Sequence, residues 1–204
     1  MKVKIALFAL LSFLALNLKG QNSQANFYIE TGLINTYPIT YTRNPEEMYF
    51  KPQVGYSFGF GFCSQKTKNF RFQAGIGITI AKFERNLFYF GMSYDIPKAL
   101  SLTVLEAPIS FVLNGKHIYG KLSILPHLDL KDKYVDTQTG IGASLAVGLR
   151  MNLLERKILA DIEPYIKVHT LFPFAPSEYQ ERLHGLGIVV RICFNKTNNE
   201  TSLP

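Results

Sequence analysis

The chain has 204 residues, of which 47% are hydrophobic and 18% charged, and its formal net charge is +7. Lys2, Lys4 and Lys19 contribute to that charge, so residues 21–204 carry 19 basic and 15 acidic residues, a net charge of +4. The basic residues are scattered rather than clustered, which argues against nucleic acid as a partner. Sixteen Phe and eleven Tyr with no Trp suit a membrane barrel with aromatic girdles.

Residues 1–20 have the layout of a secretory signal peptide. Lys2 and Lys4 precede an apolar run from Ile5 to Leu16, and the small residue Gly20 marks a cleavage site. A run of twelve residues is too short to cross a bilayer, which takes about 20. We therefore expect export and cleavage after Gly20, which leaves a soluble periplasmic protein or a membrane barrel.

The exported part reads as eight β-strands in one domain, residues 21–194, followed by a polar tail, residues 195–204. The clearest strand alternates Phe70, Phe72, Ala74, Ile76, Ile78 and Ile80 with polar or small residues, and successive side chains of a strand point to opposite faces. The predicted strands are Asn26–Asn35, Gln53–Cys63, Phe70–Phe83, Ala99–Asn114, His117–Leu130, Gly140–Asn152, Lys157–Thr170 and His184–Phe194.

The connections between these strands alternate in length. Three are tight turns, and the Asn114-Gly115 pair is a strong hairpin signal. Four are long: 36–52, 84–98, 131–139 and 171–183. Short periplasmic turns and long extracellular loops are typical of bacterial outer-membrane barrels, and an even number of strands places both termini on the short-turn side. The predicted fold is therefore all-β: an eight-stranded antiparallel up-and-down transmembrane β-barrel preceded by a signal peptide.

The second face of the strands combines glycines with charged residues, which fits the narrow lumen of a membrane barrel. A soluble barrel would instead place the apolar face inside, around a core or one small ligand. We expect Ile76, Ile78 and Ile80 to touch lipid. We expect a lumen charge network of Arg71, Glu106, Lys121, Arg150, Asp161, Glu163, Lys167 and Arg191.

The fourth strand contains Val104-Leu105-Glu106-Ala107-Pro108-Ile109-Ser110-Phe111. It resembles the Leu-Glu-Ile-Pro strand of the PorT-like outer-membrane β-barrel proteins of the Bacteroidetes, with Ala107 in place of a larger aliphatic residue. The order of turns and glycines in the last four strands and the aromatic end at Phe194 are also similar. The resemblance implies an outer-membrane barrel of that family, and it is the only ground for an accessory role in protein secretion.

Glu106 has the phase of the inward face, where an unpaired buried charge is costly. We expect a structural ion pair with Arg71 or Lys121, with a proton or substrate site as the alternative. His117, His127, His169 and His184 raise the possibility of a lipid-modifying hydrolase. However, His169 and His184 have opposite phases, and no Ser is expected within reach of His169. We expect no catalytic, cofactor-binding or metal site, and no cofactor.

Cys63 and Cys193 are both predicted to point inward near the periplasmic rim. Their strands flank the first strand, so the backbones should lie about 9 to 10 Å apart. A disulfide takes Cα atoms within about 7 Å, which favours two free thiols.

One predicted loop is unusually apolar. Its residues Leu87, Phe88, Tyr89, Phe90 and Met92 either extend two strands above the bilayer or form an exposed patch that docks an envelope protein. The favoured function is a small, non-enzymatic outer-membrane barrel acting in envelope structure or through partner proteins, with membrane lipid as its surroundings. The alternatives are a narrow solute pore, disfavoured because eight strands enclose a filled interior, and a soluble ligand-binding barrel.

Overall fold

A computed structural model of the chain describes residues 25–40, 47–65, 69–89, 92–93, 98–131, 138–153, 158–174 and 181–194. The predicted signal peptide and the polar tail lie outside these ranges. Within them, no helix is long and apolar enough to cross a membrane.

The described residues form one antiparallel sheet of ten strands. The strands are β1 (Ala25–Thr40), β2 (Glu47–Gln65), β3 (Phe70–Tyr89), β4 (Met92–Ser93), β5 (Lys98–Glu106), β6 (Ile109–Asn114), β7 (Ile118–Lys131), β8 (Gly140–Leu153), β9 (Ile158–Pro173) and β10 (Glu181–Phe194). All eight predicted strands are present, the fourth as the two segments β5 and β6.

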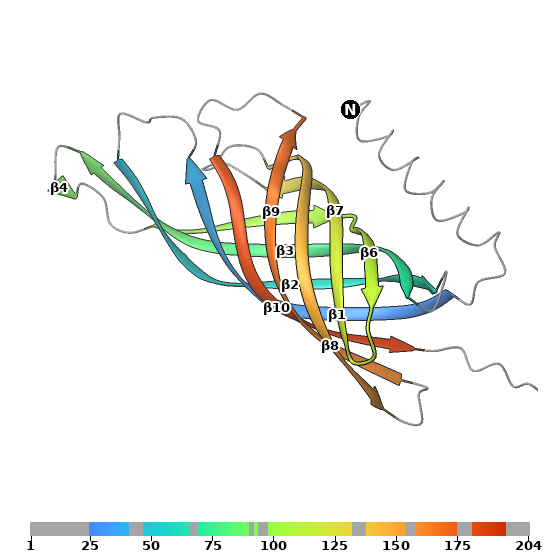
Figure 1. Cartoon of the computed structure of the whole chain (residues 1–204). Coiled ribbons are helices and arrows are strands. Elements are labelled where there is room, and N and C mark those ends of the chain that lie inside the picture. The colour runs from blue at the N-terminus through green and yellow to red at the C-terminus, as the bar shows by residue number, and fades with distance from the viewer. Residues whose placement is uncertain are drawn as a thin grey trace, which may run out of the picture.

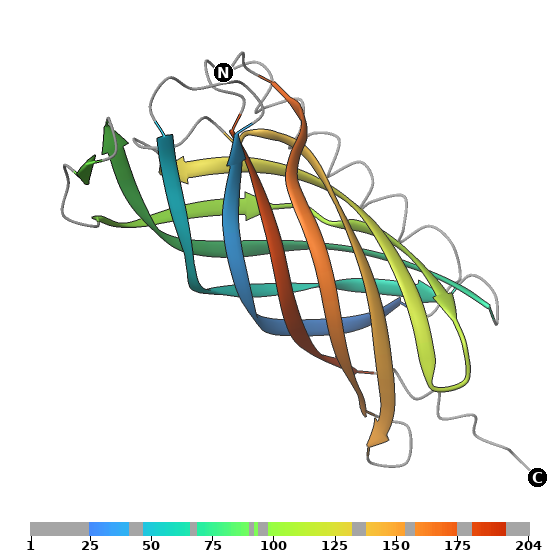
Figure 2. The same cartoon turned by 60° about the vertical axis from the view of Figure 1, so that its left-hand side comes forward.

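The sheet closes into a ring (Figures 1 and 2). Around the wall each strand pairs with the next, with β5 and β6 both lying between β3 and β7. β10 returns to pair with β1 over fourteen positions from Phe27↔Phe194 to Thr40↔Glu181. On the other side β1 pairs with β2, and β2 pairs with β3, so the hydrogen-bonded path is continuous. The chain is therefore an all-β, antiparallel up-and-down barrel, as predicted, and its first and last strands meet at a closing seam.

The fourth strand is interrupted at Ala107 and Pro108 without a change of register. Pro108 has no N–H to give to the ladder, but its carbonyl accepts from Gly75 N at 3.1 Å. The Ala107 N–H donates to the carbonyl of Pro126 on β7 at 2.8 Å. The pairs Gly77↔Glu106 and Ala74↔Ile109 have the same register on either side of the interruption, so β5 and β6 together form one strand of the barrel wall.

Three of the predicted loops are shorter than expected. β1 extends to Thr40, β9 extends to Pro173 and β10 begins at Glu181, and β2 and β3 continue beyond the rest of the wall. Their pairing extends to Glu47↔Phe88, whereas β1 pairs with β2 only as far as Asn35↔Val54. The end of this two-stranded ribbon, together with β4, projects from the barrel in Figure 1. The residues 47–52 and 84–89, predicted as loops, are thus strands, since pairing to each other satisfies their backbone groups.

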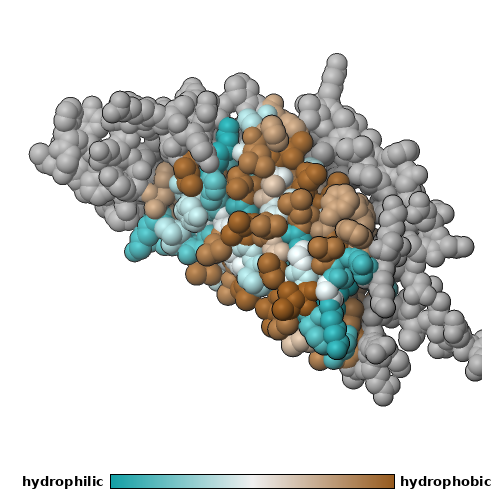
Figure 3. Space-filling view, viewed as in Figure 1, coloured by the Kyte–Doolittle hydropathy of each residue, from teal (hydrophilic) through white to brown (hydrophobic). Residues whose placement is uncertain are grey.

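Over most of the wall the large apolar side chains point outward, and many of the charged ones point inward. On β2, Val54, Phe58 and Phe60 are 54%, 56% and 52% exposed, whereas Arg71 at the start of β3 is buried. Hydrophobic side chains gather over the strands on the face shown in Figure 3. Ile76 and Ile78 are exposed as predicted, and Ile80 is partly exposed. The alternative of a soluble barrel with an apolar interior requires the opposite orientation.

Candidate functional site in the barrel lumen

The middle of the lumen contains a carboxylate held by three side chains from two other strands. Glu163 on β9 accepts hydrogen bonds from Arg191 Nη1 on β10 at 2.9 Å and from the Tyr119 hydroxyl on β7 at 2.8 Å. The Lys121 ammonium forms an ion pair with the other oxygen of Glu163. All four residues belong to inward phases of their strands, which is why residues far apart in sequence meet here.

Arg191 carries this network across the closing seam. Its guanidinium also binds Glu30 on β1, with Nη2 2.6 Å and Nε 2.9 Å from Oε2 of Glu30. Glu30 lies directly opposite Arg191 in the β1–β10 register. The planar guanidinium thereby bridges two carboxylates, one on each side of β10, a geometry that its fork of donors favours. Glu30 was not predicted as a network member, although its position in an inward phase of the first strand is the signal that could have found it.

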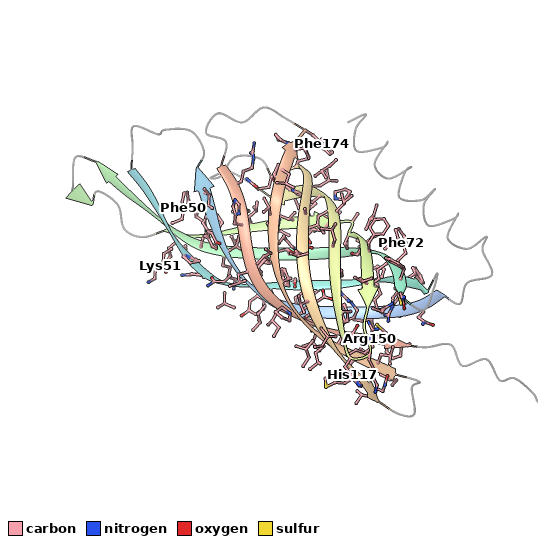
Figure 4. The ribbon with its side chains drawn as sticks, viewed as in Figure 1. Phe50, Lys51, Phe72, His117, Arg150 and Phe174 are labelled. Atoms are coloured by element: carbon pink, nitrogen blue, oxygen red, sulfur yellow. The ribbon has the colours of Figure 1, made fainter. Side chains whose placement is uncertain are left out.

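A second pair lies nearer the turn end of the barrel. Arg150 Nε and Nη2 on β8 donate to the two oxygens of Asp161 on β9 at 3.0 and 3.3 Å. Arg150 also contacts the Asn114 side chain at 3.1 Å, and its guanidinium lies 4.7 Å from the centre of the Tyr119 ring. Figure 4 shows Arg150 and His117 near one end of the barrel and Phe174 near the other.

Glu106 is paired, but with a different partner from the two that were expected. Lys167 Nζ on β9 lies 2.8 Å from both oxygens of Glu106 and 3.2 Å from the Thr79 hydroxyl. Lys121, one expected partner, is engaged by Glu163. The reason is the closed ring: β9 faces β5 across a narrow lumen, so the pairing runs across the barrel rather than between neighbouring strands.

Arg71, the other expected partner of Glu106, lies in the interior but in a separate cluster. It is 7% exposed, and its guanidinium Nη1 donates to Cys63 Sγ at 3.9 Å. Cys63 and Cys193 are both free and buried, and they pack with Tyr28 in one cluster. The remaining predicted network residues, Lys121, Arg150, Asp161, Glu163, Lys167 and Arg191, all point inward and form the ion pairs given above.

The lumen becomes apolar toward the loop end, which the sequence analysis did not anticipate. Phe83, Leu102, Val104 and Leu183 form a fully buried cluster together with Ala81 and Leu100. The inward residues of β5, Leu100, Leu102 and Val104, are in phase with Glu106. These residues alternate with the outward residues Ser101 and Thr103, and that alternation in the sequence could have predicted that the apolar residues of β5 face inward.

His127 and His169 both lie in the buried interior of the barrel. His127 Nδ1 lies 2.7 Å from the Leu125 carbonyl and its Nε2 lies 3.2 Å from Thr170 Oγ1. His127 and Thr170 are each 1% exposed. His169 is fully buried, with Nδ1 3.6 Å from Glu106. In the described ranges, no group of three or more His, Cys, Asp or Glu residues is placed to hold a metal ion.

Side chains fill most of the interior. A cavity of about 60 Å³ remains between Glu30, Ser57, Tyr165 and Lys167 in the middle of the lumen. That volume holds a few water molecules, since one water needs about 10 to 15 Å³ by this measure. Among the described residues, the hydroxyls of Ser57 and Tyr165 have no hydrogen-bond partner, which makes them the groups that such waters would satisfy.

The predicted partner loop lies partly outside the described residues. The backbone at Leu87, Phe88 and Tyr89 belongs to β3, and Met92 belongs to β4, which pairs with Tyr89. Phe90 lies outside the described residues. The backbone thus follows the first of the two readings of this segment, an extension of the strands, as far as Tyr89.

Neither a protein-family model nor a curated protein matches the chain. Three solved structures have a similar course. The crystal structure of Neisserial surface protein A is 13% identical and covers 82% of this chain and 97% of its own, with a TM-score of 0.45.

The solid-state NMR structure of outer membrane protein AlkL is 13% identical and covers 90% of this chain and 95% of its own, with a TM-score of 0.45. The crystal structure of outer membrane protein OprG from Pseudomonas aeruginosa is 8% identical and covers 85% of this chain and 97% of its own, with a TM-score of 0.46. The likeness to the PorT-like proteins is therefore a resemblance in sequence only. The assignment of the fold as a barrel is based on the strand order and pairing of this chain.

Proposed function

We propose that this protein is an outer-membrane β-barrel that acts in envelope structure or partner binding through its outer surface, and that it is neither an enzyme nor a pore. The observation that carries this proposal is the orientation of the strands. Large apolar side chains such as Phe58, Phe60 and Leu145 are 52–56% exposed, whereas the charged residues are paired inside. Hydrocarbon is the solvent in which that arrangement is stable, and a closed ring satisfies the backbone there.

Extraction separates a membrane barrel from a soluble one. Membranes from expressing cells are washed with alkaline carbonate and then with detergent, and the solubilised protein is run unheated and heated on a gel. We expect release by detergent only and a faster band in the unheated sample. Release of folded protein by carbonate would contradict the membrane location.

The filled lumen supports a barrel that does not conduct. Arg191, Tyr119 and Glu163 occupy the middle of the interior, and a cavity of about 60 Å³ lies beside Glu163. We expect no conductance steps when the purified protein is inserted into a planar bilayer, with insertion verified by flotation of vesicles made from the same preparation. Regular steps from the unaltered protein would favour the pore.

Partner binding would use the end of the β2–β3 ribbon. Its residues 47–52 on β2 pair with β3 but not with β1, so one edge of the ribbon has no strand partner in the described residues. Apolar residues at such a place mark an interaction site. An accessory role in protein secretion, suggested by the PorT-like resemblance alone, would be one form of this function.

The test replaces residues 87–92 with a Gly-Ser segment and compares the proteins that crosslink to the barrel in whole cells. The matched control replaces the 114–116 turn at the opposite end of the barrel. We expect the first change to remove specific crosslinks and the second to leave them. Identical crosslinks from both variants would end the partner-binding proposal while leaving the membrane location intact.

A further inference from the structure

Arg71 differs from every other buried cation of the described lumen in having no carboxylate. Lys121 binds Glu163, Arg150 binds Asp161, Lys167 binds Glu106, and Arg191 binds Glu30 and Glu163. Among the residues the structure describes, no Asp or Glu lies within ion-pair distance of Arg71, although Arg71 is 7% exposed. A buried charge without a counter-charge is costly. Arg71 therefore has a buried positive charge that no carboxylate of the described residues balances.

The group that Arg71 contacts is a thiol that belongs to a pair. Its Nη1 lies 3.9 Å from Cys63 Sγ, and Cys63 and Cys193 pack together with Tyr28 in one buried cluster. Both cysteines are fully or almost fully buried, at 2% and 0% exposed. They lie 130 residues apart in sequence and meet only because the ring closes at the seam.

The backbone geometry disfavours a disulfide between these two thiols. Cys63 lies opposite Asn26 and Cys193 opposite Tyr28, on the two flanks of β1. Two strand spacings are about 9 to 10 Å, and the two-residue offset along β1 adds to the separation. A disulfide usually holds Cα atoms within about 7 Å. The two side chains nevertheless pack in one cluster, and a metal ion held between two sulfur atoms spans a wider gap than a direct sulfur–sulfur bond.

From this geometry we propose that Cys63 and Cys193 form a two-thiolate site for a soft monovalent metal ion, Cu(I) or Ag(I), at the turn end of the lumen. Soft thiolates are the ligands that such ions select. On binding, both thiols release their protons and two sulfur–metal bonds form, with no change of oxidation state. The resulting complex has one negative charge, from two thiolates and one monovalent cation, and Arg71 supplies the one positive charge that balances it.

Ag(I) is the first probe, because it binds thiolates without a reductant. The reduced, folded barrel in detergent micelles is mixed with excess Ag(I) and then desalted. The ratio of silver to protein is measured by inductively coupled plasma mass spectrometry. We expect one bound ion per barrel, and none after desalting in Cys63→Ser or Cys193→Ser, each verified as folded by its unheated gel band. Cu(I) with a chromophoric chelator as competitor gives the affinity.

Arg71→Gln tests the charge balance. It removes the guanidinium and should weaken Cu(I) binding by tenfold or more while leaving both thiols in place. The control is Lys51→Gln, which also removes one positive charge but lies at the other end of β2 from Cys63, with a side chain that is 72% exposed, and it should leave the Cu(I) affinity unchanged.

X-ray absorption of the unaltered Cu(I)-loaded protein supplies a measurement that does not depend on variants, and two sulfur neighbours are expected. Three results would overturn the proposal: metal retention by the double Cys→Ser variant, absence of retained metal in the unaltered barrel, or a native protein 2 Da lighter through an internal disulfide.

Discussion

Glu106 and Lys167 illustrate how a charge is accommodated inside this barrel. The ammonium lies within 2.8 Å of both carboxylate oxygens, and both side chains are less than one tenth exposed. At such a site the cost of removing one partner exceeds the value of the pair itself, because the remaining charge stays buried.

Glu106→Gln should therefore lower the free energy of unfolding by about 3–5 kcal/mol, the range for breaking a buried pair. The double variant Glu106→Gln/Lys167→Met removes both charges and should recover most of the loss. Folded fractions are read from the unheated gel band over a urea series. Lys51→Gln is the control: its ammonium is 72% exposed and 3.9 Å from Glu84, so its effect should stay below about 1 kcal/mol. A double variant no more stable than Glu106→Gln would show that the charge is not the cause.

At the scale of the element, the strands adapt to one another through glycines placed beneath large inward side chains. The Tyr119 ring of β7 lies over Gly148, its partner in β8, where a Cβ would be 2.1 Å from the ring. The ring can thus lie flat against the wall and reach Glu163. Gly120, next to Tyr119 on β7, points outward and has open space around it.

Gly148→Ala should therefore displace the Tyr119 ring, weaken its hydrogen bond to Glu163 and destabilise the barrel by about 1–3 kcal/mol, as overpacking does. Gly120→Ala in the same hairpin serves as the control and should be neutral or slightly stabilising, since it adds an apolar group to the outer face. The urea midpoints of the two variants provide the comparison. Equal midpoints would mean that the ring moves aside at no cost.

How far the sequence predicts these elements depends on the length over which a pattern persists. The strands from Phe70 and Gly140 follow a strict alternation, so their faces were predicted correctly. The ends of β2 and β3 were missed because Pro52 and the charged residues near Glu84 resemble a loop until the partner strand is known. The interior pairing of Glu106 was missed for the same reason, since a single strand's phase gives the face but not the strand across the lumen.

At the scale of the whole molecule, the outer surface decides where the protein is stable. Leu145 in the middle of β8 and Leu153 at its end are both outward, at 54% and 46% exposed. They differ in their distance from the end of the barrel and not in residue type or strand.

Leu145→Arg should cost about 2–4 kcal/mol of folding free energy in lipid vesicles, and Leu153→Arg about 0–1 kcal/mol, if the barrel spans the bilayer with the end of β8 near its surface. In detergent micelles the difference between the two should shrink. Measurement is by urea titration of vesicle-inserted protein. Equal costs in vesicles would argue that the two positions lie at the same depth.

The contact of Arg191 with Glu30 and Glu163 has a consequence for assembly. These three residues come from the first strand and the last two, so the contact cannot exist before the final strand arrives. If β10 docked on β1 two residues out of step, Arg191 would face Gly32 or Tyr28 instead of Glu30, with apolar residues still outside. Hydrophobicity alone would accept that mistake, because a two-residue slip preserves the alternation. The slipped register would leave buried charges unpaired, so the ion pairs that fill the lumen also favour the correct register when the barrel closes.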